Sequence, residues 1–348
     1  MLNPFGKRLG LLVVIIMAIA VLAGCGGKKE AAQPGGAQQQ PETITLKLGH
    51  VGVADDTHSW QKFAKKYAEV VAQKTNGKVK IVVYPASQLG ADREMNEALQ
   101  LGNQEMGLSS TMTLGNFVPK LQVWDLPYIF PPDNAGVDKI LDGAIGDELA
   151  QAAEEKGFKI LSFWENDWRM MSNSKRPIQT VEDLKGLKMR IPETPALMDW
   201  LPRTGATPTP MAFSELYTAL QQKTVDGQDN GVGLTFKSKF YEVQKYYSLT
   251  RHIYSPLAVI ASKKVWDKLP ADVQKVLADT AKELAPEQRA YNRDTSVQWL
   301  EDMKAKGMQI NDISAENIKG FQDSAKPTFD KFRANLGDLI DKMLEAGK

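Results

Sequence analysis

The alternation of apolar and polar residues from Ile44 onward predicts strands and helices in turn. Residues 44–51 (ITLKLGHV) alternate with the period of a strand. Residues 59–74 (SWQKFAKKYAEVVAQK) repeat their apolar positions at helical spacing, and Asn76-Gly77 marks the end of that helix. The same criteria predict strands at 78–85, 105–110, 159–164, 187–191, 225–228 and 252–262, and helices at 91–102, 147–156 and 214–222. Such alternation with short connections predicts an α/β fold with largely parallel sheets.

The end of the chain has a different pattern. From Asp272 onward the residues are almost wholly helical in spacing, with interruptions expected at Pro286, Gly307 and Pro327. Upstream, Thr180 and Ser214 have the residue type and position of helix N-caps. In an α/β protein of two lobes, a long helical tail can brace both lobes.

The start of the chain indicates export. Lys7 and Arg8 precede an apolar run, residues 9–23, which is shorter than the roughly twenty residues that cross a bilayer. This fits a secretory signal. Leu22-Ala23-Gly24-Cys25 resembles the bacterial lipoprotein signal, which implies cleavage after residue 24 and lipidation of Cys25. The alternative is a cysteine that happens to follow an uncleaved anchor. Residues 25–43, rich in Gly, Gln, Ala and Pro, are expected to be a flexible tether.

Charge and motif content exclude several classes of protein. The 43 basic and 42 acidic residues leave the chain close to neutral, which argues against a nucleic-acid partner. Cys25 is the only cysteine, so no internal disulfide can form. The three histidines are scattered, and we find no HExxH, GxxxxGK[ST], GxSxG or CxxC motif. We therefore expect no metal, no cofactor and no catalysis.

Several polar residues are expected where strands end. Arg190 lies near the end of one strand, Arg169 follows another with Trp168 beside it, and Asp229 and Asn230 follow a third. Ligands of open α/β sheets bind beyond the carboxyl ends of strands, and a guanidinium matches a carboxylate bidentately. These residues could therefore converge on an organic anion. Taken singly, each arginine could instead form an ordinary salt bridge, Trp168 and the nearby Phe213 could be core residues, and Asn230 a turn residue.

The chain resembles a substrate-binding protein of the tripartite ATP-independent periplasmic (TRAP) transporters, of the C4-dicarboxylate-binding type. The resemblance runs from about Leu46 to about Ile310. It is carried in order by KIVVYPASQLGADREMNEALQLG, LPYIF, WRMMSNSKRPIQTVEDLKGLKMRIPETP and TPTPMAFSELYTALQQKTVDGQDNG. The SELYTALQ…VDGQDN and KGLKMR blocks are the specific ones. The family usually has VDGQEN followed by proline, so Asp229 and Gly231 depart from its pattern.

The resemblance implies the site residues and their roles. The arginine of KGLKMR, Arg190, makes the main salt bridge with the ligand carboxylate, and Arg169 is an auxiliary contact. Phe213 and Asn230 match further ligand-binding positions of the family. Trp168, Asp92 and Ser110 lie where relatives vary with their substrate.

The resemblance also implies architecture, partners and location. Two lobes are joined by strands that cross near residues 165 and 253: lobe I holds 44–165, about 254–290 and the C-terminal tail, and lobe II holds 166–253 and about 291–324. The protein is expected to be a monomer, anchored outside the cytoplasm, that delivers a C4-dicarboxylate or a sugar acid, with a slight preference for the former, to small and large TRAP membrane subunits. An ABC-type binding protein, an extracytoplasmic sensor and a secreted enzyme acting on a carboxylate remain alternatives.

Overall fold

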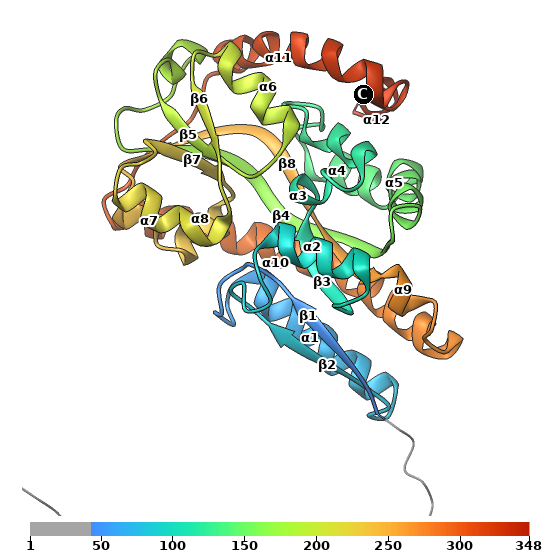
Figure 1. Ribbon diagram of the computed structural model, residues 1–348. Coiled ribbons are helices and arrows are strands. Elements are labelled where there is room, and N and C mark those ends of the chain that lie inside the picture. Colours follow the sequence, from blue (N-terminus) through green and yellow to red (C-terminus); the bar gives the residue numbers. More distant parts are fainter. Residues whose placement is uncertain (1–42, 348) are drawn as a thin grey trace, which may run out of the picture. The chain divides into compact units, whose positions relative to one another are not determined.

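The computed structural model describes residues 43–347 and has the α/β architecture that the sequence predicts (Figure 1). The expected signal, the lipidation site Cys25 and nearly all of the tether lie outside the described residues. The strands are β1 (Ile44–Gly49), β2 (Val79–Tyr84), β3 (Met106–Ser110), β4 (Phe158–Asn173), β5 (Lys188–Ile191), β6 (Thr207–Pro210), β7 (Gly227–Asn230), β8 (Tyr246–Ser262) and β9 (Gln309–Asn311).

The helices vary widely in length. The α-helices are α1 (Ser59–Lys74), α2 (Asp92–Leu101), α3 (Thr111–Leu114), α4 (Asn134–Leu141), α5 (Ala144–Glu154), α6 (Pro195–Arg203), α7 (Leu216–Gln221), α8 (Val232–Lys237), α9 (Lys263–Trp266), α10 (Ala271–Ala305), α11 (Ala315–Leu336) and α12 (Leu339–Ala346). Short 3-10 helices are η1 (Pro119–Asp125), η2 (Val181–Leu184), η3 (Phe213–Glu215) and η4 (Phe240–Glu242). None of the helices within residues 43–347 has the length and apolar character needed to cross a membrane.

Two long antiparallel strands, β4 and β8, form the centre of one mixed sheet with the order β2-β1-β3-β8-β4-β7-β5-β6 (Figure 1). Strand β3 pairs with the C-terminal part of β8, from Ser110 opposite Leu257 to Met106 opposite Ala261. Strand β7 pairs with the C-terminal part of β4, from Met170 opposite Asn230 to Asn173 opposite Gly227. Because β4 and β8 are antiparallel, the strands β1–β3 (the β1–β3 group) and β5–β7 (the β5–β7 group) attach at opposite ends of the pair.

Each group of strands has its own apolar cluster. Around the β1–β3 group, Trp60, Phe63 and Tyr67 of α1 pack with Trp164 and with Leu277 of α10. Around the β5–β7 group, Met189 packs with Leu197 and Trp200 of α6 and with Phe321 of α11. Each fully buried aliphatic or aromatic side chain of this kind contributes roughly 1.5–3 kcal/mol. Residues 165 and 253 fall within β4 and β8, respectively, and the predicted lobe boundaries stay a prediction.

The long helix α10 continues through Pro286, and α11 continues through Pro327, so the interruptions expected at these prolines are wrong. Both prolines are on exposed faces of their helices. There, the carbonyl that loses its N–H partner can bond to water while the apolar face stays packed. The break expected at Gly307 is confirmed, with φ at +95°. Helix α10 contacts β4, α1 and α8, and therefore reaches both groups of strands.

Other expectations differ at element ends. Ser214 is not a helix N-cap, because Phe213–Glu215 forms the 3-10 helix η3 and α7 begins only at Leu216. The strand expected at 225–228 lies at Gly227–Asn230, so Asp229 and Asn230 belong to the strand rather than follow it. Thr180 does precede a helical turn, η2, and donates its backbone N–H to the Asp183 carboxylate at 2.8 Å.

Candidate functional site

Arg190 is a buried cation among the candidate site residues. It lies on β5, between β6 and β7, and only 2% of its surface is exposed. Its Nε and Nη2 donate to the Met211 carbonyl oxygen at 3.0 and 2.6 Å. Among residues 43–347, no carboxylate oxygen lies within 4.0 Å of its guanidinium nitrogens. Burial, together with the nearby charge of Arg169, lowers the pKa of Arg190 to about 10, so it remains charged at neutral pH.

Arg169, on β4, has a carboxylate partner. Its Nε donates to Asp229 Oδ2 and its Nη2 to the Asp229 carbonyl oxygen, both at 2.5 Å. His252 Nε2 lies 3.3 Å from the same Oδ2. Burial disfavours the charged form of Asp229, but the charge of Arg169 and the hydrogen bonds outweigh it and hold the Asp229 pKa well below its usual range. The positive charge of Arg169 is therefore neutralised within the protein.

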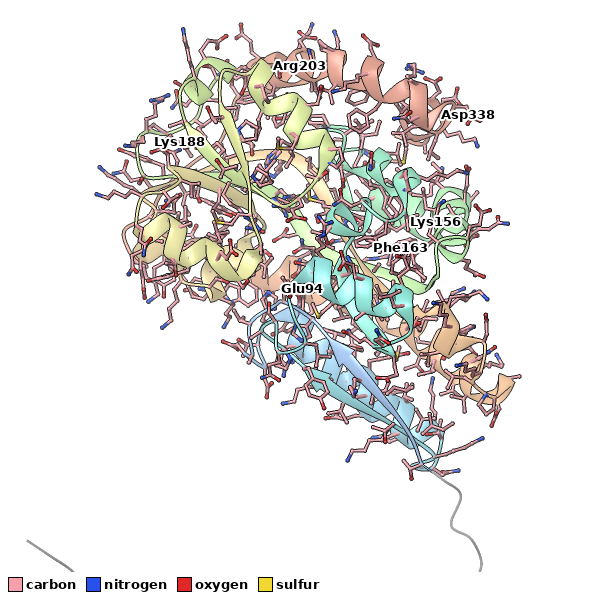
Figure 2. All side chains as sticks on the ribbon, in the orientation of Figure 1. Glu94, Lys156, Phe163, Lys188, Arg203 and Asp338 are labelled. Carbon is pink, nitrogen blue, oxygen red and sulfur yellow. The ribbon has the colours of Figure 1, made fainter. Side chains whose placement is uncertain are left out.

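Asp92 and Ser110 come from the β1–β3 side of the molecule. Asp92 is the first residue of α2. In Figure 2, the labelled residues Glu94 and Lys188 mark the elements of Asp92 and Arg190, respectively. Burial raises the Asp92 pKa to about 6, and the charge of Arg190 acts against this rise. An ion pair between Arg93 of α2 and Glu193, two residues after β5, at 3.5 Å joins the two elements. Ser110, the N-cap of α3, lies with its Oγ 3.4 Å from Ser255 Oγ on β8.

Asn230 and Phe213 lie at or after the C-terminal ends of strands of the β5–β7 group. Asn230 is buried at the end of β7, where its Nδ2 donates to Gln228 Oε1 at 2.5 Å and its carbonyl oxygen accepts from the Tyr247 hydroxyl at 3.1 Å. Phe213 is half-buried in η3, with its ring centroid 5.9 Å from that of Phe240. Phe213 also packs against the apolar cluster of the β1–β3 group, so it contacts elements on both sides.

Trp168 packs against residues other than the candidate site residues described above. Successive residues of a strand point to opposite faces, and Trp168 packs edge-to-face on Tyr254 with ring centroids 5.2 Å apart. It lines a separate cavity of about 220 Å³ together with Tyr128, Phe130, Pro132, Leu249, Thr250, Arg251, Ile313, Ile318 and Gln322. Arg169, its neighbour in sequence, is not among the residues of that cavity. The role of Trp168 as a ligand contact stays a prediction.

Comparison with known proteins identifies the family. Residues 49–335 match the family described as "Bacterial extracellular solute-binding protein, family 7". The chain belongs to this family. This TRAP-type solute-binding protein is 37% identical to the C4-dicarboxylate-binding periplasmic protein of Rhodobacter capsulatus, over 85% of this chain and 88% of the relative. It is 35% identical to the 2,3-diketo-L-gulonate-binding periplasmic protein of Escherichia coli K12, over 80% of this chain and 84% of the relative.

A solved structure supports the same assignment. A TRAP periplasmic solute-binding protein from Polaromonas, bound to D-erythronate, is 38% identical, with a TM-score of 0.83 over 86% of this chain and 98% of that one. The expected family and fold are confirmed. The solute-binding protein is thus an extracytoplasmic, non-enzymatic component of transport. Within residues 43–347, no group of three or more His, Cys, Asp or Glu side chains is arranged to hold a metal ion.

Two buried polar residues of this solute-binding protein were missed by the sequence analysis. Asp125, at the end of η1, accepts from Thr194 Oγ1 at 2.8 Å through Oδ2 and has no hydrogen-bond partner for Oδ1 in the described structure. Burial raises its pKa to about 7, although the charge of Arg169 opposes the rise. Asn166, on β4, donates Nδ2 to Ser255 Oγ at 3.1 Å, and its buried Oδ1 likewise has no partner there. Two features of the sequence could have pointed to them: for Asp125, a charged residue directly before LPYIF, and for Asn166, the polar run Glu165-Asn166-Asp167 between apolar segments.

The departure at Gly231 has a steric explanation. A Cβ atom at this position would lie 2.2 Å from Asp167 Cβ, far inside van der Waals contact. Asp167 in turn accepts from the Val232 backbone N–H at 2.9 Å, at the start of α8, and from Ser296 Oγ on α10 at 3.2 Å. In this solute-binding protein, glycine at 231 therefore makes room for an aspartate that connects β4, α8 and α10.

Proposed function

We propose that this solute-binding protein captures a small organic acid anion through Arg190 and delivers it to TRAP membrane subunits. The observation that carries the proposal is a buried guanidinium without a carboxylate partner within 4.0 Å among residues 43–347. A buried charge is costly unless it is paired. The Met211 carbonyl accepts from two of its nitrogens, while a guanidinium has five N–H donors. A ligand carboxylate would supply both the missing charge and the missing acceptors.

The ligands of similar proteins support this class of substrate. Those of the Rhodobacter, Escherichia and Polaromonas proteins are a C4-dicarboxylate, 2,3-diketo-L-gulonate and D-erythronate, which all carry a carboxylate. Arg190 comes from the β5–β7 group, whereas Asp92 and Ser110 come from the β1–β3 side. An anion held between them would make contacts with both groups only in a closed state, and such differential contacts shift an open–closed equilibrium.

Isothermal titration calorimetry with organic acids tests the proposal. Arg190→Ala is expected to weaken binding by about 2–5 kcal/mol, the scale of removing one partner from a buried charge pair. Arg190→Lys should also bind poorly, because one ammonium cannot reproduce the planar fork. Arg203→Ala is the matched control, because Arg203 is exposed on α6 (Figure 2). It forms an ion pair with Asp199 on the same helix. Equal affinities of wild type and Arg190→Ala would refute the proposal.

A further inference from the structure

We propose that the site selects a polyhydroxylated monocarboxylate, a sugar acid, over a dicarboxylate, with Asp125, Asp92 and Asn166 as specificity-determining acceptors of ligand hydroxyls. The inference rests on the proposed function, since it takes Arg190 as the carboxylate-binding group. It goes further by naming the substrate class and by assigning roles to Asp125 and Asn166.

The first argument is the balance of charge around Arg190. A dicarboxylate needs a second cation, and Arg169 is the nearby candidate. However, Arg169 already pairs with Asp229 at 2.5 Å, with both side chains only 3% exposed. Asp92 lies near enough to interact with the charge of Arg190, and Asp125 near enough to interact with that of Arg169. A second ligand carboxylate would therefore meet aspartates and an arginine that is already neutralised.

The second argument is the type of hydrogen-bonding group left without a partner. Among the buried oxygens that have no hydrogen-bond partner in the described structure, four carboxylate or amide oxygens come from elements that also carry or flank the candidate site residues: Asp92 Oδ1, Asp125 Oδ1, Asn166 Oδ1 and Asp229 Oδ1. Asp125, Asn166 and Asp229 are each at least 95% buried as residues. Buried polar atoms in native proteins are nearly always hydrogen-bonded, so these acceptors require donors.

Hydrogen bonds link Asn166 to the candidate residue Ser110 and link Asp125 to the segment that follows the strand of Arg190. Asn166 bonds to Ser255, whose Oγ lies 3.4 Å from that of Ser110, and Asp125 bonds to Thr194, three residues after β5. A ligand carboxylate can only accept hydrogen bonds, whereas each ligand hydroxyl can donate one. The site therefore calls for a ligand with one carboxylate, which Arg190 would bind, and several hydroxyls, which would donate to the unpartnered oxygens. An aldonate or a similar sugar acid has this composition.

Calorimetry with chain-matched acids tests this inference. Erythronate, tartrate and succinate share one chain length, as do galactonate, galactarate and adipate; within each series the acids differ in hydroxyls and in a second carboxylate. Wild type is expected to bind the better of erythronate and galactonate about tenfold or more tightly than the dicarboxylates of the same length. At pH 8, above their raised pKa values of about 6 and 7, Asp92 and Asp125 are ionised in the ligand-free protein. Asp92→Asn and Asp125→Asn keep the side-chain shape and remove that charge, so each should reduce the preference at this pH by about fivefold or more.

The control is Asp147→Asn, an exposed residue of α5, which should keep the wild-type preference. A matched dicarboxylate that binds wild type as tightly as the monocarboxylate overturns the inference. So does an unchanged preference in both Asp92→Asn and Asp125→Asn. If a dicarboxylate binds tightly and Arg190→Ala abolishes that binding, only this inference fails. If no acid binds wild type, or Arg190→Ala binds as well as wild type, the proposed function fails too.

Discussion

Arg190 and Arg169 lie on strands of the same sheet, separated by β7, yet their partners differ. Arg169 on β4 reaches Asp229 on β7, while Arg190 on β5 donates only to a backbone carbonyl among the hydrogen bonds of the described structure. Asp229, on the intervening strand β7, pairs with Arg169 and leaves Arg190 without a carboxylate partner in the described structure. Replacing the glutamate that relatives have by Asp229 still leaves an acid long enough to reach Arg169. Arg169 is therefore part of an ion pair within the protein, whereas Arg190 is the cation that we propose binds the ligand.

Asp125 makes the ligand-free protein sensitive to pH. Its pKa is raised from an ordinary value of 3.8 to about 7 by burial, so the folded state holds a proton that the unfolded state releases. Its contribution to stability is therefore greatest at low pH and falls as the pH rises from about 4 through 7. We expect the ionisation of Asp125 to lower the free energy of unfolding by about 2–3 kcal/mol between pH 5 and pH 8.

Urea unfolding of wild type and Asp125→Asn at pH 5 and pH 8 measures this effect. The amide side chain of the variant cannot ionise, so the variant should gain stability relative to wild type as the pH rises, by the amount given above. His50, buried with its pKa lowered to about 4, has the opposite pH dependence, but it is present in both proteins and cancels in the difference. A difference between the two proteins that does not change with pH would contradict the burial argument.

At the scale of elements, the junction of β7 and α8 depends on close packing against β4. Gly231 precedes the first residue of α8, and Asp167 of β4 occupies the space where a larger residue would place its Cβ atom. The register of β4 against β8 also slips between Glu165 and Asp167. This irregularity coincides with the buried polar residues that bond to α8 and α10.

Gly231→Ala is expected to destabilise the protein by about 1–3 kcal/mol, the usual cost of overpacking a closely packed position. Asp167→Gly in the same chain removes the clashing Cβ atom, so a double-mutant cycle from chemical denaturation should show favourable coupling between the two substitutions. Gly320→Ala in α11 is the control: its nearest neighbour is 3.9 Å away, and alanine in a helix costs nothing or stabilises slightly. Additive effects of the Gly231 and Asp167 substitutions would show that the two residues do not compete for space.

Elements with a strong period could be predicted from sequence, and the polar centre of the sheet could not. The bounds of α1 match the prediction because its apolar face is regular and its end is marked. Strand β4 was predicted only as far as Trp164, because Glu165, Asn166 and Asp167 interrupt the apolar pattern that a buried strand usually has. The partners of these residues, such as Gln288 and Asn292 of α10, are more than a hundred positions away in sequence.

The candidate site likewise contains residues that could be predicted from sequence and residues that could not. Arg190 and Asp92 were predicted from the family resemblance, and an ion pair between Arg93 and Glu193 at 3.5 Å joins the helix of Asp92 to the segment after the strand of Arg190. Trp168 was named because relatives vary with their substrate at its position, and its role as a ligand contact stays a prediction; in the structure it packs on Tyr254. The surroundings of Asp125 could not be predicted, since Thr194, which donates to it, and Arg169 and Asp229, whose charges act on its pKa, come from three separate segments that only the fold brings together.

At the scale of the whole molecule, the sequence predicts a tether to the membrane through Cys25. Stable anchoring needs more than one acyl chain or an additional signal, since one chain gives only reversible binding. We expect Cys25→Ser to shift the exported protein from the membrane fraction to the extracytoplasmic soluble fraction. Its ligand affinity should stay the same, because Cys25 precedes the residues that form the site. Retention of Cys25→Ser in the membrane fraction would argue for an uncleaved apolar anchor instead.

A structure of the protein with its bound organic acid tests the central claim most directly. The account predicts that the ligand carboxylate accepts from the Arg190 guanidinium at roughly 2.7–3.2 Å, with Arg169 still paired to Asp229. The contrary result is an acid bound elsewhere, with the Arg190 guanidinium taken by a protein carboxylate such as that of Asp92.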